Sequence, residues 1–241
     1  MNNKILKSPD HIAIIMDGNA RWAKKNNLSL FTGHKQGVEN IKEIAQACID
    51  FKVKYLTLYA FSSENWQRSK SEVENLLKLL DNYLDNNLKP LVDNDIKINI
   101  FGDFTKIPNK ILTKVKQAQE KTNNNKSLIL NVAFSYGARQ EIVEATKKIA
   151  FGVLNNQIEI DNINQELFSK NLYNPNLPDP DLLIRTAGDL RVSNFLLWQI
   201  AYSELFFSNA YWPEFNKKNL EEAIFDFNKR ERRYGKRRKN G

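Results

Sequence analysis

The feature that most constrains the fold of this chain is a short apolar run that ends abruptly in a charged turn. Residues 12–16 are continuously apolar and rich in β-branched side chains, a pattern typical of a strand buried on both faces. Asp17, Gly18 and Asn19 follow as turn-forming residues, and Asn19 is predicted to cap a helix that begins at Ala20. The segment therefore predicts a strand, a tight turn and a helix in direct succession.

The same succession recurs along the chain. Further strands are predicted at residues 54–61, 96–101, 128–133, 181–184 and 204–207, and further helices at 71–84, 107–121, from 140 onward, 195–202 and 220–232. Ser71 and Glu74 have the spacing of a capping box. The alternation predicts an α/β fold, a single domain with a mostly parallel central β-sheet flanked by helices. Its predicted bounds are residues 11–228, with an extension over 1–10 and a basic tail over 229–241.

The helix predicted over residues 71–84 has a wide apolar face. Val73, Leu76, Leu77, Leu80 and Leu84 form one stripe, and Leu79 and Tyr83 lie beside it. The pattern fits a deeply buried helix and equally a helix that lines an apolar cavity.

Composition limits the chemistry of the chain. With one cysteine, Cys48, and two histidines, His11 and His34, an internal disulfide, a thiolate cluster and a polyhistidine zinc site are excluded. Any metal would be held by oxygen ligands, which points to Mg²⁺. The first residues lack the apolar core of a signal peptide, and no run approaches the roughly 18 apolar residues of a spanning helix. The protein is predicted to be cytoplasmic.

Polar side chains gather beside the predicted strand ends. They include four arginines and three isolated carboxylates: Arg21, Arg68, Arg185, Arg191, Asp17, Glu64 and Glu204. In an open parallel sheet, ligands bind beyond the carboxyl ends of the strands, where such groups converge. Guanidinium groups grip phosphate bidentately and stay charged. The set predicts a pocket for two polyanionic ligands.

Several familiar chemistries lack their motifs in this sequence. There is no G-x-x-x-x-G-K-[ST] loop, no G-x-G-x-x-G fingerprint, no G-x-S-x-G elbow and no paired D-D-x-x-D motif. Nucleotide-dependent and covalent mechanisms are therefore disfavoured. Loss of a diphosphate leaving group, assisted by Mg²⁺ and arginine, needs only positioning and electrostatics.

Four segments, at residues 11–34, 61–68, 185–194 and 233–235, resemble in the same order the signatures of the cis-prenyltransferases, especially bacterial members. The resemblance spans about His11 to Gly235. It implies a Mg²⁺-dependent homodimer that condenses isopentenyl diphosphate repeatedly onto an allylic diphosphate such as farnesyl diphosphate. The growing chain would occupy a hydrophobic tunnel, and the product would be a long polyprenyl diphosphate such as undecaprenyl diphosphate for the cell wall.

The resemblance also implies residue roles. Asp17 matches a catalytic, magnesium-binding aspartate, Asn65 a proposed proton acceptor and Glu204 a second metal-linked carboxylate. Substrate-binding matches are Gly18, Asn19, Ala20, Arg21, Trp22 and His34 for the allylic diphosphate, Ser62, Ser63, Glu64, Trp66 and Arg68 for substrate contacts, and Arg185, Arg191, Val192 and Ser193 for isopentenyl diphosphate. An amide is a poor base, so Asn65 is equally interpreted as orienting substrate while diphosphate takes the proton.

The chain departs from the family pattern at five positions. Ala20 and Ala187 replace glycine, Asp189 replaces glutamate, and Ser69 replaces proline. Leu30 stands where bacterial members often carry a diphosphate-binding arginine, which predicts weaker affinity for one diphosphate without loss of activity.

The basic tail has three interpretations. Residues 229–239 carry eight basic side chains and a single acidic one, Glu231. Such a segment is interpreted as a solvated terminus, as a site that attracts anionic lipid headgroups, or as a site that binds nucleic-acid phosphates. Within it, residues 233–235 resemble the family's Arg-x-Gly motif, which reaches across a homodimer. Peripheral contact with the inner membrane face for product release is expected, and nucleic-acid binding is not.

Two alternatives to the leading hypothesis stay open. An enzyme of the same class would make a shorter or longer product, because tunnel length does not follow from the pattern. The second alternative is a non-catalytic partner subunit of the same family. Such subunits tend to lack the first aspartate and the loop that follows it. Asp17, Asn19 and Arg21 are all present, which favours an active chain.

Overall fold

The computed structural model describes residues 7–231, and its centre is a six-stranded sheet in which every paired strand is parallel. The strands are β1 (His11–Ile15), β2 (Tyr55–Ser62), β3 (Ile96–Phe101), β4 (Leu128–Tyr136), β5 (Leu182–Arg185) and β6 (Glu204–Phe207). Their order across the sheet is β3-β4-β2-β1-β5-β6. The predicted α/β class is confirmed. Most of the predicted extension and tail, including the Arg233–Gly235 motif, lies outside the described residues.

Strand β1 is buried on both faces, as its sequence predicts. Ile12 and Ile14 join one apolar cluster, and Ala13 and Ile15 join the other, because successive side chains of a strand point to opposite faces. The first face is covered by α2 (Leu30–Asp50), α3 (Lys70–Asp93), α4 (Asn109–Lys121) and α7 (Lys217–Lys229). The second is covered by the start of α5 (Ala138–Leu154) and by residues 191–203.

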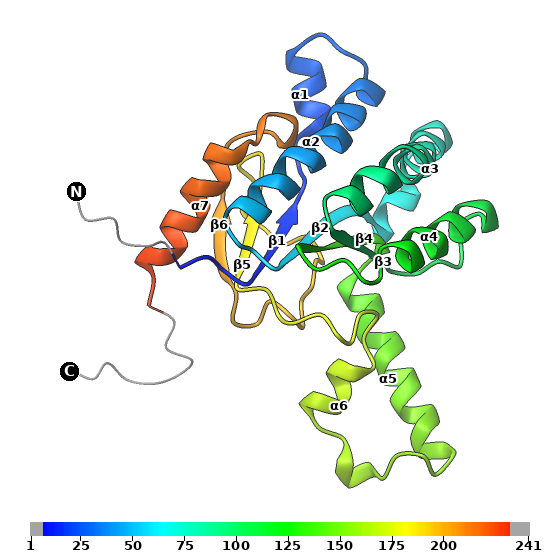
Figure 1. Cartoon of the computed structure of the whole chain (residues 1–241). Helices are drawn as coiled ribbons and strands as arrows, with labels where there is room; N and C mark the ends of the chain where they lie inside the picture. The colour runs from blue at the N-terminus through cyan, green and yellow to red at the C-terminus, as the bar shows by residue number, and fades with distance from the viewer. Residues whose placement is uncertain (1–6, 232–241) are drawn as a thin grey trace, which may run out of the picture.

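Two shorter helices complete the arrangement. Helix α1 (Asn19–Lys25) follows β1 directly, and α6 (Gln165–Lys170) lies beside α5. Figure 1 shows α5 and α6 extending away from the sheet as an arm. Within residues 7–231 we find no helix with the length and apolar character needed to cross a membrane.

The helix predicted over residues 195–202 is wrong. Residues 191–203 form turns, and Ser193, Asn194 and Leu196 have φ values of 46°, 61° and 48°. A right-handed helix does not propagate through such residues. The apolar side chains that imitate a helical stripe instead pack on the second face, where Phe195 stacks on Tyr59 with ring centroids 4.4 Å apart.

Two predicted helix caps are also wrong by one or two residues. Gly18 caps α1 with φ 101°, and the Asn19 side chain donates to the Met16 carbonyl instead. At α3 the cap is Ser69, whose hydroxyl accepts from the Glu72 amide, so Ser71 already lies inside the helix. Both errors arise because several capping residues stand close together and the tertiary path of the chain selects one.

Candidate active site

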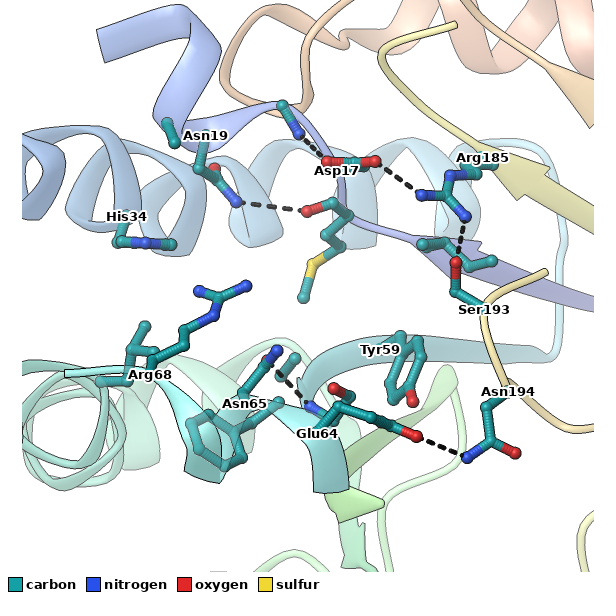
Figure 2. Close-up of a pocket in the computed structure, with 18 of the residues that line it drawn as sticks. Asp17, Asn19, His34, Tyr59, Glu64, Asn65, Arg68, Arg185, Ser193 and Asn194 are labelled. Carbon is teal, nitrogen blue, oxygen red and sulfur yellow. Dashed lines mark hydrogen bonds and ion pairs between the residues drawn. The ribbon is translucent and has the colours of Figure 1, made fainter. Parts of the chain in front are cut away.

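A cavity of about 580 Å³ opens at the carboxyl ends of β1, β2 and β5, where the predicted polar residues converge. The predicted residues that line it are Asp17, Gly18, Asn19, Ala20, Arg21, His34, Ser62, Glu64, Asn65, Arg68, Arg185, Arg191 and Ser193. Figure 2 shows two walls that face each other. Asp17, Asn19 and Arg185 lie on one, and Glu64, Asn65 and Arg68 on the other.

Asp17 lies between two guanidinium groups. Its Oδ1 is 3.1 Å from Arg21 Nη2, and its Oδ2 accepts from Arg185 Nη2 at 2.8 Å. The Gly18 amide also donates to Oδ1 at 2.7 Å. These bonds fix both carboxylate oxygens at the end of β1.

Arg185 connects Asp17 to the segment that follows β5. Its Nη1 donates to the Arg191 carbonyl and to Ser193 Oγ, both at 2.6 Å. The residue is only 4% exposed, so these charge-assisted bonds lie in a poorly solvated position where they are strong.

Asp189 binds the remaining cations of this wall. It accepts from Arg191 Nη1 and from Arg21 Nη2, each at 2.9 Å. The hydrogen bond from Arg191, followed by that from Arg21, keeps the pKa of Asp189 below its usual value even though desolvation opposes this. Arg21, Arg185 and Arg191 are thus held around two carboxylates.

The backbone segments after β1 and β5 approach each other closely. Gly18 has φ 101°, and a Cβ built on it would lie 2.8 Å from the Ala187 Cβ, so a side chain there is excluded. Ala187 has φ 71°, a left-handed conformation that costs a non-glycine residue free energy. Its carbonyl accepts from Arg21 Nη1 at 3.1 Å, so this strained turn also positions an arginine.

The opposite wall is built by the 3₁₀ helix η1 (Ser63–Gln67). The Asn65 side-chain oxygen accepts from the Ser62 amide at 3.1 Å and closes a capping box. Because this oxygen is engaged, Asn65 offers its amide hydrogens to a ligand. Glu64 accepts from Asn194 Nδ2 at 2.8 Å, which links the two walls. Desolvation alone would raise the pKa of Glu64, but hydrogen bonds, foremost that from Asn194, lower it.

His34 and Arg68 form the end of the cavity nearest α2 and α3. Burial and then the Arg68 charge lower the pKa of His34, so the ring is neutral at pH 7. Within residues 7–231, His34 Nε2 and Arg185 Nε are buried without a hydrogen-bond partner, although Glu72 Oε1 lies 3.8 Å from His34 Nε2. Buried polar atoms are rarely left unpaired, so both are suited to a polar ligand.

A second, apolar cavity of about 80 Å³ lies next to the first, between α2, α3 and the sheet. The two share Met16, Asn19, His34, Ala60 and Leu76 as lining residues. Beyond them the lining includes Leu79, Leu80, Ile98, Val132 and Phe134. Part of the wide apolar face of α3 therefore lines a cavity, whereas Val73, Leu77 and Leu84 do not.

Some predicted residues support the site without lining the cavity. Trp22 donates to Glu214 at 2.9 Å and Trp66 to Ser135 at 2.9 Å, while Ser63 and Val192 also lie outside the lining. Leu30, at the start of α2, is 38% exposed and does not line it either.

Glu204 lies at the opposite edge of the sheet from Asp17. It begins β6 and pairs with Leu182 at the start of β5, whereas Arg185 at the end of β5 pairs with Phe207. Its carboxylate binds Arg230 at 3.0 Å. The predicted metal pair of Asp17 and Glu204 is therefore not formed within this chain, because a residue at the head of a parallel strand cannot reach the carboxyl edge. Nor do residues 7–231 contain any cluster of three histidine, cysteine, aspartate or glutamate side chains suited to a metal.

Sequence reasoning missed Tyr59, Met16 and Asn194 as lining residues. Asn194 directly follows the predicted Ser193, so its polar neighbourhood was a usable signal. Tyr59 and Met16 sit inside apolar runs, where no pattern separates a core side chain from one that faces a cavity.

The chain matches the family model described as "Putative undecaprenyl diphosphate synthase" over residues 15–235. The isoprenyl transferases of Clostridium tetani and Rickettsia typhi are 48% and 50% identical to it over 227 and 228 residues, which is 94% of this chain and 89% and 98% of those relatives.

Among solved structures, the lavandulyl diphosphate synthase of Lavandula x intermedia in complex with dimethylallyl diphosphate matches with a TM-score of 0.92 and 35% identity, over 95% of this chain and 99% of that one. A "probable undecaprenyl diphosphate synthase" from Campylobacter jejuni matches with a TM-score of 0.79 and 34% identity, over 95% and 100%.

Proposed function

Because the chain belongs to the undecaprenyl diphosphate synthase family of prenyl transferases, we propose that it is a Mg²⁺-dependent cis-prenyltransferase. It condenses isopentenyl diphosphate units onto an allylic diphosphate, preferably farnesyl diphosphate, and makes a long-chain polyprenyl diphosphate such as undecaprenyl diphosphate. The observation that carries this proposal is that a cavity lined by four arginines and an apolar cavity lie next to each other and share five lining residues.

The geometry supports an assignment of the two diphosphates. His34 lines both cavities and Arg68 lies near it, so an allylic diphosphate bound there could extend its hydrocarbon tail between α2 and α3. Isopentenyl diphosphate has no long tail and would occupy the Arg185 and Arg191 end.

The reaction then needs little covalent help from the protein. The allylic C–O bond breaks, and the arginines stabilise the negative charge that develops on the leaving diphosphate. The double-bond electrons of isopentenyl diphosphate form the new C–C bond, and a proton leaves to restore a double bond. We assign that proton to the departing diphosphate, because the Asn65 oxygen already accepts from Ser62 and its amide is placed to orient substrate.

Asp17 fits a role in holding Mg²⁺. Its hard carboxylate oxygens line the diphosphate cavity, and Mg²⁺ is usually bound by one or two carboxylates together with substrate phosphates and water. Bound there, Mg²⁺ would neutralise charge on the diphosphate oxygens. Asp189 is the nearest further carboxylate in the network, whereas Glu204 would have to act from another subunit.

The proposal includes a homodimer that works in the cytoplasm and contacts the inner membrane face when it releases its lipid product. Exposed apolar side chains support a partner surface: on the α5 arm Phe151 is 67% exposed and Leu154 80%. No nucleic-acid partner is proposed.

A shorter product is the second candidate. Two observations favour it: the apolar cavity measures only about 80 Å³, and the lavandulyl diphosphate synthase structure is similar over nearly its whole length.

The direct test is incorporation of labelled isopentenyl diphosphate onto farnesyl diphosphate, with Mg²⁺ and with chelator, followed by chromatographic measurement of product length. We expect a ladder that ends near undecaprenyl length and is absent with chelator. A product limited to one or two additions supports the second candidate. No incorporation by a folded protein contradicts the catalytic proposal and leaves the partner-subunit interpretation.

A further inference from the structure

Asn194 lies where three segments of the chain meet at the diphosphate cavity. It lines the cavity, and Figure 2 shows its side chain pointing toward Glu64 on the opposite wall. Its Nδ2 donates to Glu64 Oε1 at 2.8 Å. Its Oδ1 accepts from the backbone amide of Arg139 and its carbonyl from that of Ala138, both at 2.9 Å. One residue therefore joins η1, the start of α5 and the segment that follows β5.

We propose that Asn194 is a positioning residue for the condensation. It sets the separation between the wall that carries Arg185 and the wall that carries Asn65, and thereby aligns the two substrates. The inference rests on the proposed function and adds to it a residue to which the sequence assigns no role. Asn194 acts through its neighbour Ser193 and through Glu64 rather than through the reacting atoms.

The start of α5 gives Asn194 a fixed point of attachment. The first amide groups of a helix have no partner within it, and the residue in the cap position of α5, Gly137, has no side chain that could accept from them. Asn194 supplies the acceptors from a segment 55 residues further along the chain. A Cβ built on Gly137 would lie 2.9 Å from Asn194 Nδ2 and closer still to Ser63 Oγ, so only glycine leaves room for this contact.

The backbone around Asn194 is held in a conformation that costs free energy. Ser193, Asn194 and Leu196 all have left-handed φ values, which asparagine tolerates better than most residues. Such strain persists where the surroundings fix it, and it is concentrated at functional sites. Phe195 is fully buried on the second face of the sheet. The segment is therefore held in one conformation, and with it the Ser193 hydroxyl that accepts from Arg185.

The two side-chain hydrogen bonds of Asn194 require an amide. The Arg139 backbone N–H can only donate and needs an oxygen, whereas an ionised Glu64 can only accept and needs an N–H. Desolvation opposes ionisation of Glu64, but hydrogen bonds, foremost that from Asn194, keep its pKa below its usual value, so it is ionised at pH 7. The bond between the walls is thus charge-assisted, which makes it stronger than one between neutral groups.

The separation of the walls matters because condensation joins two bound molecules. The double bond of isopentenyl diphosphate has to approach the allylic carbon to about 3 to 3.5 Å in the correct orientation. Arg185, proposed for isopentenyl diphosphate, lies on one wall, and Arg68, proposed for the allylic diphosphate, lies on the other. A bond from Asn194 to Glu64 therefore acts on the relative position of the two substrates.

The test compares Asn194→Asp with the matched control Asn156→Asp. Aspartate keeps the size of the side chain and can still accept from Arg139, but it sets a second carboxylate against Glu64. Asn156 has a similar φ of 56° and is exposed beyond the end of α5. We expect Asn194→Asp to lower kcat for isopentenyl diphosphate addition by about 10- to 100-fold, because misalignment of bound reactants is costly. Calorimetric binding of farnesyl diphosphate should be unchanged, and Asn156→Asp should keep the wild-type kcat.

A second substitution separates positioning from a general loss of packing. Glu64→Gln in the Asn194→Asp background places an amide donor opposite the new carboxylate, so kcat should rise several-fold above that of Asn194→Asp. If Asn194→Asp does not fold, Asn194→Gly replaces it, since glycine suits the φ of 61° and removes the side chain. Asn194→Gly should show the same loss of kcat, without recovery by Glu64→Gln.

The outcomes separate this inference from the proposal beneath it. If the wild-type protein makes no product, the proposed function fails and the positioning role fails with it. If the wild type elongates and a folded Asn194→Asp keeps its kcat, the positioning role alone is wrong. An equal loss of farnesyl diphosphate affinity, or no recovery in the double variant, would make Asn194 a purely structural residue and would also contradict the inference.

Discussion

The diphosphate cavity and the apolar cavity share a boundary at His34 and Leu76, yet they are built by different physical means. At the polar end, ion pairs of 2.8 to 3.1 Å hold Asp17 between Arg21 and Arg185. The apolar end contains few directional bonds, and its dimensions follow from how leucines and Tyr83 pack. The identity of the groups therefore decides what the polar end binds, whereas side-chain volume decides what the apolar end admits.

The strongest test of this contrast is Asp17→Ala. It removes the carboxylate that both organises two arginines and is proposed to hold Mg²⁺, so kcat should fall by about 100- to 1,000-fold or more. The fold should survive, since the carboxylate lies at a strand end rather than in the core. Steady-state kinetics and circular dichroism measure the two effects, and near-normal turnover would remove Asp17 from the mechanism.

Both cavities depend on an intact sheet. Acid should destabilise the fold, because the buried ring of His11 on β1 resists protonation. Desolvation lowers the pKa of this fully buried ring to about 4, although its Nδ1 lies 2.6 Å from the Pro178 carbonyl and its Nε2 2.7 Å from Thr57 Oγ1. Between pH 6.5 and 4 the unfolded chain binds a proton that the folded chain does not. Its contribution to stability is therefore complete above pH 6.5 and falls by up to about 3 kcal/mol towards pH 4.

Chemical denaturation at several pH values measures this loss. His11→Gln should be less stable than the wild type at pH 7 but show a flatter dependence on pH over this window. An unchanged slope in the variant would mean that other groups cause the acid sensitivity.

Two matched arginine variants test which part of the polar cavity binds which diphosphate. Arg185→Ala should raise the Michaelis constant for isopentenyl diphosphate, and Arg68→Ala that for the allylic substrate, each by about 10- to 100-fold, because a bond to a charged group contributes about 1.5–3 kcal/mol. Initial rates with each substrate varied in turn measure the effects. The opposite pattern would reverse the assignment of the two subsites.

Leu30→Arg tests whether an additional cation near the boundary of the two cavities strengthens diphosphate binding. Leu30 is partly exposed and one turn before His34 on α2, so the new guanidinium should lower one diphosphate Michaelis constant by a few-fold. Leu30→Gln serves as the neutral control. If both Michaelis constants are unchanged in Leu30→Arg, the leucine does not explain any loss of affinity.

The smallest expected effect is on stability at Ala187. Glycine adopts φ 71° without strain, which favours the folded state, but it also increases the entropy of the unfolded chain. Because the relief of strain is the larger effect, Ala187→Gly should stabilise the protein by about 1 kcal/mol or less. Thermal unfolding measures it, with Ala20→Gly inside α1 as a control that should destabilise. A destabilised Ala187→Gly would show that the packing of the buried Ala187 methyl group outweighs the backbone strain.

Much of the fold followed from local pattern, because residues 96–101 alternate apolar with polar side chains and residues 205–207 form a short apolar run. The polar end was equally accessible, since Asp17, Arg68 and Arg185 lie at or shortly beyond the carboxyl ends of β1, β2 and β5, and these ends share one edge of a parallel sheet. Glu204 lies away from these residues within one chain because it stands at the start of its strand, at the opposite edge of the sheet; its predicted metal role stays a prediction. The prediction of a helix over residues 195–202 was wrong because the apolar residues there have a helical spacing but pack on the sheet from a non-helical backbone. Phe195, for example, stacks on Tyr59.

The strand order adds a consequence for how such a protein diversifies. From β1 the chain builds the sheet outward through β2 on one side, while β5 and β6 extend it on the other, so the connections after β1 and β5 leave on opposite faces and a crevice opens between them. The predicted reacting groups line this crevice, whereas α2, α3 and the strands β2, β3 and β4 together line the apolar cavity. Substitutions at Leu79 or Leu80 of α3 can therefore change the apolar cavity while the carboxylates and arginines of the crevice stay unchanged.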